Sequence, residues 1–170
     1  VRKRGDEALR EYAAKFDHVE LGALEVTEEE IEEALELVDE DFLRSVEYAA
    51  DNIGDFHRRQ LQQSWFNTRA DGAITGQKVT PLDRVGIYVP GGRAQYPSTV
   101  LMNAVPAGVA GVGEIIMCTP PQKDGKVNPY TLAAASVAGV DRIFKTGGAQ
   151  AIGAMAYGTE SIPAVDKVTG

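Results

Sequence analysis

The chain is poor in cysteine and in uninterrupted apolar runs, and each shortage excludes a class of protein. Its 170 residues include one cysteine, Cys118, which cannot form an internal disulfide and has no partner at metal-ligand spacing. Proline, glycine or charge interrupts every apolar run well before the ~18 residues that a membrane-spanning helix needs, and no signal segment opens the chain. We therefore expect a cytoplasmic protein with no membrane partner.

Basic charge is also scarce. The chain carries 17 Lys and Arg against 25 Asp and Glu, a net charge of -8, and its pI is about 4.8. Because binding to a nucleic-acid backbone needs a basic face, we expect no nucleic-acid partner. With 44% hydrophobic residues the chain can form a packed core, and a small molecule is the expected ligand.

Charge and turn residues divide the chain into two unlike parts. Residues 1–80 carry 19 acidic and 10 basic side chains, whereas 81–170 carry 6 and 7, and all 8 prolines lie in the second part. We place the boundary between residues 71 and 82. This predicts a first part over 1–82, belonging to one domain, and an α/β domain over 83–170.

The first part has apolar residues at helical spacing. Thr27 and Glu30 form a capping box that predicts a helix start near residue 28. A longer helix is expected over 41–61, and Asp71-Gly72 predicts the turn of a β-hairpin between residues 65 and 80. The glutamate-rich helix faces are expected to be solvated surface. The apolar stripes of the three helices are Leu9, Tyr12, Ala13 and Phe16; Ile31, Ala34, Leu35 and Val38; and Phe42, Val46, Ala49, Ile53 and Phe56.

Strand and helix patterns alternate after residue 85, which predicts a parallel sheet flanked by helices. Asn128 and Pro129 suit a helix cap and first position, and Gly139 and Gly158 suit helix ends. The short strand segments are almost wholly apolar, as expected where helices cover both faces of a sheet. The expected strands are 85–89, 114–119, 142–145 and 166–169, and the expected helices are 98–110, 128–138 and 149–157.

Two glycine-containing segments follow expected strands and are candidate ligand-binding edges. Segment 86–92 reads Gly-Ile-Tyr-Val-Pro-Gly-Gly and holds Tyr88, and segment 147–150 reads Gly-Gly-Ala-Gln and ends in Gln150. Glycines there let a ligand approach the backbone, and the first amides of a helix favour anionic groups. Neither segment matches the Gly-x-Gly-x-x-Gly fingerprint of dinucleotide-binding folds, so the glycines alone are equally consistent with structural turns.

Longer motifs resemble the L-histidinol dehydrogenase family over nearly the whole chain. One motif is segment 86–92 followed by Tyr-Pro-Ser-Thr-Val-Leu-Met-Asn-Ala-Val-Pro-Ala over 96–107. The other begins Gly-Gly-Ala-Gln-Ala-Ile over 147–152, continues Ala-Tyr-Gly-Thr-Glu-Ser-Ile-Pro over 156–163, and reaches Val-Asp-Lys at 165–167. Two long motifs in this order are far more specific than either glycine pair.

The resemblance implies a zinc-dependent homodimeric enzyme that oxidises L-histidinol through L-histidinaldehyde to L-histidine with two NAD. It implies incomplete Rossmann-like units, so the expected fold is a helical N-terminal segment and a β-hairpin leading into such a sheet. By motif, Tyr88 and Gln150 match the family's NAD-contacting tyrosine and glutamine, whose flat ring and amide suit the cofactor. Pro90, Gly91 and Gly92 would shape the turn beside them.

The resemblance also implies that the zinc ligands and the proton-transferring Glu-His pair lie beyond residue 170. The chain ends before the family's Gly-Pro-Gly-Asn loop and begins without methionine, so we expect an N-terminal to central fragment that is inactive alone. We accordingly predict no catalytic residue and no metal ligand within this sequence.

The remaining candidate residues are expected to be structural. His18 and His57 have no partners at metal spacing, so a surface or packing role is expected for each. Cys118 could hold an aldehyde as a thiolate, but it follows Ile115-Ile116-Met117 in an expected buried strand, where a thiol is inert. Two alternatives stay open: another NAD-linked reductase, which would need a reactive cysteine, and a non-catalytic assembly module that uses the acidic helical part.

Overall fold

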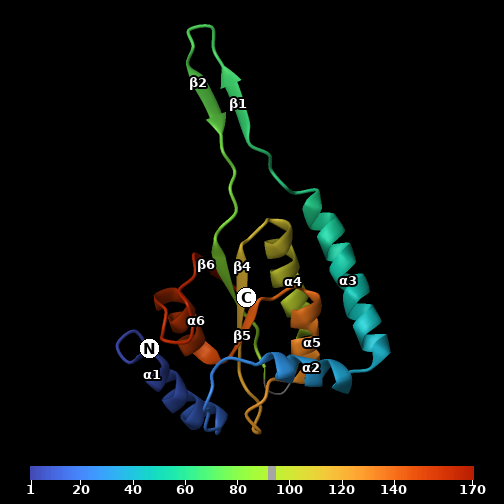
Figure 1. The fold of residues 1–170 in the computed structure, drawn as a ribbon, viewed down its shortest axis with the longest axis vertical. Coiled ribbons are helices and arrows are strands. Elements are labelled where there is room, and N and C mark those ends of the chain that lie inside the picture. Colours follow the sequence, from blue (N-terminus) through green and yellow to red (C-terminus); the bar gives the residue numbers. More distant parts are fainter. Residues whose placement is uncertain (92–94) are drawn as a thin grey trace.

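A four-stranded parallel sheet forms the centre of the computed structural model, which describes residues 1–91 and 95–170 (Figure 1). The strands are β3 (Arg84–Tyr88), β4 (Glu114–Thr119), β5 (Arg142–Lys145) and β6 (Lys167–Thr169), in the order β5-β4-β3-β6. The chain therefore steps outward from β3 to β5 and returns to the other side of β3, as the first half of a doubly wound sheet does. The predicted α/β class with a parallel sheet is confirmed.

Helices α2, α3, α4 and α5 cover one face of the sheet. Their bounds are Glu28–Leu37, Glu40–Arg58, Pro97–Val109 and Pro129–Val137. Alternate residues of β3 point to this face because successive side chains of a strand point to opposite sides. The core here contains Val85 and Ile87 from β3, Val89 directly after it, Met117 from β4, and residues of all four helices. Burial of this apolar surface is the main term that holds the helices on the sheet.

The opposite face carries the start of the chain and the last helix. Helices α1 (Gly5–Tyr12) and α6 (Gly148–Tyr157) pack there with the π-helical turn η1 (Ala13–Asp17). Leu9, Ile116, Phe144 and Met155 are almost fully buried between these elements and the sheet. Gly86 makes this packing possible, since a Cβ atom there would lie 2.5 Å from the sulfur of Met155.

The predicted helix caps are present. The Thr27 hydroxyl accepts a hydrogen bond from the Glu30 amide, and the Glu30 carboxylate accepts one from the Thr27 amide. Asn128 caps α5, with Pro129 in its first turn. Glu30 is not merely solvated surface, because its other oxygen accepts a hydrogen bond of 2.6 Å from the buried Lys145 ammonium group. One glutamate therefore both starts α2 and ties it to β5.

Two predicted apolar stripes end differently from expectation. Phe16 is 57% exposed, because the chain forms η1 after Tyr12 and the wider π-helical turn rotates Phe16 off the stripe. Phe56 is 60% exposed near the end of α3, which stops at Arg58 rather than at residue 61. The other members of these stripes are buried or half-buried.

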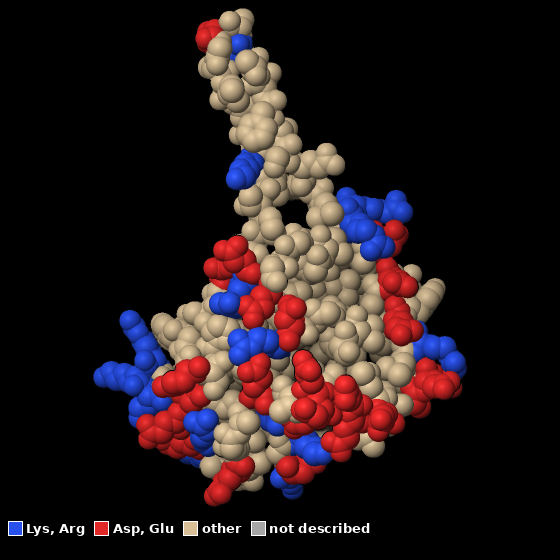
Figure 2. All heavy atoms as spheres, in the orientation of Figure 1, with Lys and Arg blue, Asp and Glu red and all other residues tan. Residues whose placement is uncertain are grey.

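The predicted hairpin extends away from the rest of the molecule (Figure 1). Strands β1 (Trp65–Thr68) and β2 (Ile74–Gln77) are antiparallel, and Gly72 in the turn has a φ of 84°. Every residue of both strands is exposed, including Trp65, Phe66 and Ile74. Figure 2 shows that Lys, Arg, Asp and Glu gather on the body and are sparse along this hairpin. None of the helices in the described part of the chain has the length and apolarity to span a bilayer.

Candidate functional site

A cleft of about 990 Å³ lies where β3, β4 and β5 end. Tyr88, the last residue of β3, lines it together with Thr119, the last residue of β4. Gly147, Gly148 and Gln150, which follow β5, complete this edge. Ligands of open α/β sheets bind outside the carboxyl ends of the strands, and this cleft occupies that position.

The structure brings together both residues that the sequence singled out. Tyr88 and Gln150 line the same cleft although they follow different strands. They are linked through the first residue of α6, since the Gly148 amide donates a hydrogen bond of 3.0 Å to the Tyr88 hydroxyl across 60 positions of sequence. A phenol that accepts this bond keeps its own proton to donate to a ligand.

Gly148 is the position where the conformational freedom of glycine is needed. Its φ is 65°, in the left-handed region, and a Cβ atom there would lie 2.8 Å from Oε1 of Gln150. The Gln150 amide therefore lies over the start of α6, close to the backbone of Gly148. The first-turn amides of α6 and the two ends of the Gln150 amide form a set of donors and one acceptor suited to a polar, partly anionic ligand.

Gly91 and Gly147 have a different reason to be glycine. A Cβ atom at Gly147 would lie 2.6 Å from Cβ of Pro120, and one at Gly91 would lie 2.9 Å from Cγ of the same proline. Both glycines thus admit Pro120, which lines the cleft after β4. At these two positions the structural explanation holds. Gly92, predicted to shape the same turn, lies outside the described residues.

One wall of the cleft was not predicted from the sequence, and it comes from the N-terminal part of the chain. Phe16, Asp17 and His18, at the end of η1, line the same cleft. Oδ2 of Asp17 is buried and has no hydrogen-bond partner among the described residues. Burial raises the pKa of Asp17 above its ordinary value of 3.8, and His18 offsets this only in part. No spacing or motif signalled this wall, because only the packing of α1 brings it to the strand ends.

Two of the remaining candidates, Cys118 and His57, have structural surroundings, whereas the third, His18, lines the cleft. Cys118 is fully buried in β4, as predicted, and burial raises the pKa of its thiol to about 12; the inertness of this thiol stays a prediction. Nδ1 of His57 lies 2.7 Å from Oε1 of Gln60 at the end of α3. His18 lies in the cleft wall with a φ of 59°. Within residues 1–91 and 95–170, no three His, Cys, Asp or Glu side chains are grouped so that they could hold a metal ion.

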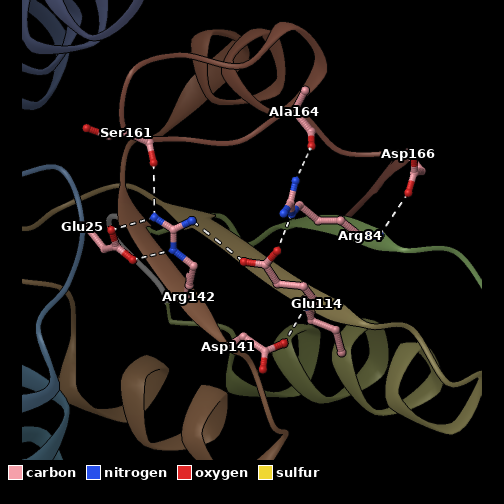
Figure 3. A network of polar contacts seen from close by, with 9 residues as sticks. Glu25, Arg84, Glu114, Asp141, Arg142, Ser161, Ala164 and Asp166 are labelled. Carbon is pink, nitrogen blue, oxygen red and sulfur yellow. Dashed lines mark hydrogen bonds and ion pairs between the residues drawn. The ribbon is translucent and has the colours of Figure 1, made fainter.

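A polar network braces the sheet away from the cleft, near the starts of the strands (Figure 3). Arg142 of β5 donates two hydrogen bonds, of 2.7 and 2.9 Å, to the carboxylate of Glu25. Glu114 at the start of β4 pairs with Arg84 of β3 and also lies 3.8 Å from Arg142. Arg84 and Arg142 further bond the backbone oxygens of Ala164 and Ser161. This network joins five segments at the end of the sheet opposite the cleft: the segment of Glu25, the strands β3, β4 and β5, and the loop of Ser161 and Ala164.

Fold and cleft together define the class of protein. The chain is an α/β protein with half of a doubly wound parallel sheet and a polar cleft at the strand ends. Such an edge is where proteins of this architecture bind nucleotides and other phosphate-bearing ligands.

Comparisons with known proteins give the family. The model of the histidinol dehydrogenase family matches residues 1–170, so the chain belongs to the histidinol dehydrogenase family. It is 58% identical to histidinol dehydrogenase of Methanosarcina mazei and 55% identical to that of Bacillus subtilis. In both cases the match covers 100% of this chain and 40% of the relative. The chain thus spans about two-fifths of the length of these relatives.

A solved structure agrees with this assignment. The fold is similar to that in the crystal structure of histidinol dehydrogenase from Elizabethkingia anophelis, with a TM-score of 0.92 and 41% sequence identity. The match covers 97% of this chain and 38% of that one. The predicted family resemblance is confirmed.

Proposed function

We propose that this chain is the NAD-binding part of a histidinol dehydrogenase, an oxidoreductase of histidine biosynthesis. The whole enzyme would oxidise L-histidinol through L-histidinaldehyde to L-histidine with two NAD and a zinc ion. Family membership supports the reaction, and the convergence of Tyr88 and Gln150 on one cleft supports the cofactor site. NAD, when bound, would supply the hydride acceptor.

The described residues fit NAD by their chemistry. The Tyr88 hydroxyl and the Gln150 amide can bind ribose or amide groups, and the start of α6 favours the pyrophosphate. Asp17 adds a carboxylate oxygen that no described residue satisfies. In this proposal the chain's own residues bind and orient the cofactor. The packing of Pro120 against Gly91 and Gly147 holds the loops at the strand ends together.

The described residues do not fit zinc, since they include no group of three metal-binding side chains. We therefore derive no step through the metal from this chain. We propose that the zinc ligands lie outside it and that the 170-residue chain does not oxidise histidinol alone. Zinc-dependent reduction of NAD by the purified chain in the presence of histidinol would contradict this.

The test of the cofactor site is an NAD titration of the purified chain, followed by calorimetry and by amide chemical shifts at millimolar NAD. We expect Tyr88→Phe and Gln150→Ala each to weaken binding about three- to tenfold, the effect of losing one hydrogen bond. Tyr157→Phe, at the far end of α6, and Gln62→Ala, outside the cleft, are the matched controls and should bind as the unaltered chain does. Equal binding by all four variants, or no binding by the folded chain, would refute the proposed site.

Four further proposals concern the oligomeric state, the compartment, the substrate and the division into domains. We propose a homodimer in the cytoplasm, with L-histidinol as the small-molecule substrate. We also propose that residues 1–82 belong to a first domain and that residues 83–170 form the NAD-binding domain. The buried, unpaired Cys118 is consistent with a reducing compartment. Sedimentation of the purified protein over a range of concentrations tests the dimer.

A further inference from the structure

Asp17 lines the cleft without a hydrogen bond that would explain its position there. Its side chain lines the cleft beside His18, while Oδ2 is buried with no partner among the described residues. Burying a carboxylate without donors destabilises the folded state, and most such groups in native proteins are hydrogen-bonded. The terminal torsion of an aspartate is soft, so the carboxylate can turn about its Cβ–Cγ bond toward the cleft. The carboxylate thus keeps acceptor capacity for a ligand in the cleft.

In the described part of the chain, the sheet has no acidic residue at the place where one usually binds the sugar of a dinucleotide. In doubly wound folds an Asp or Glu about 20 residues beyond the glycine turn accepts hydrogen bonds from the ribose of NAD. Here the strand after the first glycine segment is β4, which ends in Cys118 and Thr119 and is followed by two prolines. Asp17 reaches the same edge from η1, a different part of the chain.

We propose that Asp17 accepts hydrogen bonds from the ribose hydroxyls of the adenosine half of NAD and thereby selects NAD over NADP. This inference rests on the proposed function. A carboxylate with two oxygens matches two neighbouring hydroxyls. The extra 2′-phosphate of NADP would place like charges together in a poorly solvated position, and such a contact disfavours the wrong ligand.

Asp124 provides the matched control. It lines the same cleft, but its side chain is exposed and its Oδ1 already accepts a hydrogen bond of 3.0 Å from the Lys126 amide. Asp124→Asn therefore makes the same change of charge without removing a buried, unpartnered acceptor. An effect of overall charge would appear equally in both variants.

The experiment is a titration of the purified chain and its Asp17→Asn, Asp17→Ala and Asp124→Asn variants with NAD and with NADP, read by calorimetry and amide chemical shifts. We expect Asp17→Asn to weaken NAD about tenfold and to narrow the preference for NAD over NADP by about the same factor, as for a lost charge-assisted hydrogen bond. Asp124→Asn should leave the preference within about twofold. Thermal unfolding should show Asp17→Asn at least as stable as the unaltered chain, since it removes a buried charge.

The outcomes separate the two proposals. If the unaltered chain binds NAD but Asp17→Asn keeps the same NADP-to-NAD ratio, or if both Asn variants change it equally, the role of Asp17 is refuted and the cofactor site stands. If the folded, unaltered chain binds no NAD at millimolar concentration, the proposed function of this cleft fails first. A changed ratio in the Asp17 variants alone supports the inference.

Discussion

Burial has different chemical consequences for two residues of this chain, Cys118 and Asp17. Cys118 and Asp17 both have a raised pKa because burial disfavours the charged form. For Cys118 this removes a nucleophile from the centre of β4. For Asp17 it leaves a carboxylate oxygen without a donor among the described residues at the wall of the cleft, where we propose that a ligand supplies the donors.

The buried thiol gives a prediction at the residue scale. With a pKa of about 12 and a fully buried side chain, Cys118 should react with iodoacetamide only when the chain unfolds. We expect labelling of the native chain at neutral pH to be slower than labelling in urea by several orders of magnitude. Mass spectrometry over a time course measures both rates. Rapid labelling of the native chain would reopen the alternative of a reactive-cysteine reductase.

Elements of this fold differ in how they are stabilised. The strands β3, β4 and β5 are buried on both faces, whereas β1 and β2 have each other as their only strand partners among the described residues. An isolated two-stranded hairpin is marginally stable in water. Its exposed Trp65, Phe66 and Ile74 also form apolar surface on a segment where charged residues are sparse (Figure 2).

The hairpin therefore gives a prediction at the element scale. In hydrogen exchange at low protein concentration, amides of residues 65–77 should exchange orders of magnitude faster than those of β4. The fluorescence of Trp65, the single tryptophan, should be typical of a solvent-exposed indole. Protection equal to that of β4, increasing with concentration, would show instead that a second copy covers the hairpin.

On the scale of the whole molecule, α1 of the N-terminal part, which leads to the cleft wall, is anchored to the loop that follows α6. The buried Asp6 accepts a hydrogen bond of 3.3 Å from the Ser161 amide and another from its hydroxyl, while the Asp6 amide donates one of 2.8 Å to Glu160. Burial alone would raise the pKa of Asp6, but the hydrogen bonds from Ser161 and Thr159 outweigh it and lower the pKa.

This anchor predicts a pH-dependent stability. Because the folded pKa of Asp6 lies below its ordinary value of 3.8, its contribution is present above that pH and is lost as the pH falls through the folded pKa. Asp6→Ala should lower the free energy of unfolding by about 1–3 kcal/mol at neutral pH, with a smaller loss in acid. Urea unfolding at both pH values measures this. Glu7→Ala, at an exposed neighbour, should change it little, and an equal loss in both variants would contradict the anchor.

The sequence determined the elements of this protein, because each depends on local chemistry. Short apolar runs predicted β3, β4 and β5 within one residue of their observed bounds. The Thr27–Glu30 capping box predicted the start of α2, and Asp71-Gly72 predicted the turn of the hairpin. Family motifs also led to Tyr88 and Gln150, which the fold brings into one cleft. These signals lie within a few residues of the features that they predict.

Only the tertiary structure decided which distant groups meet. The contact of Pro120 with Gly91 and Gly147, the second bond of Glu30 to Lys145, and the place of Asp17 in the cleft all join segments far apart in the chain. The exposure of Phe16 depends likewise on η1, whose wider turn the regular helical spacing does not predict. Such contacts depend on how helices pack on the two faces of the sheet, and no local pattern of residues encodes that arrangement.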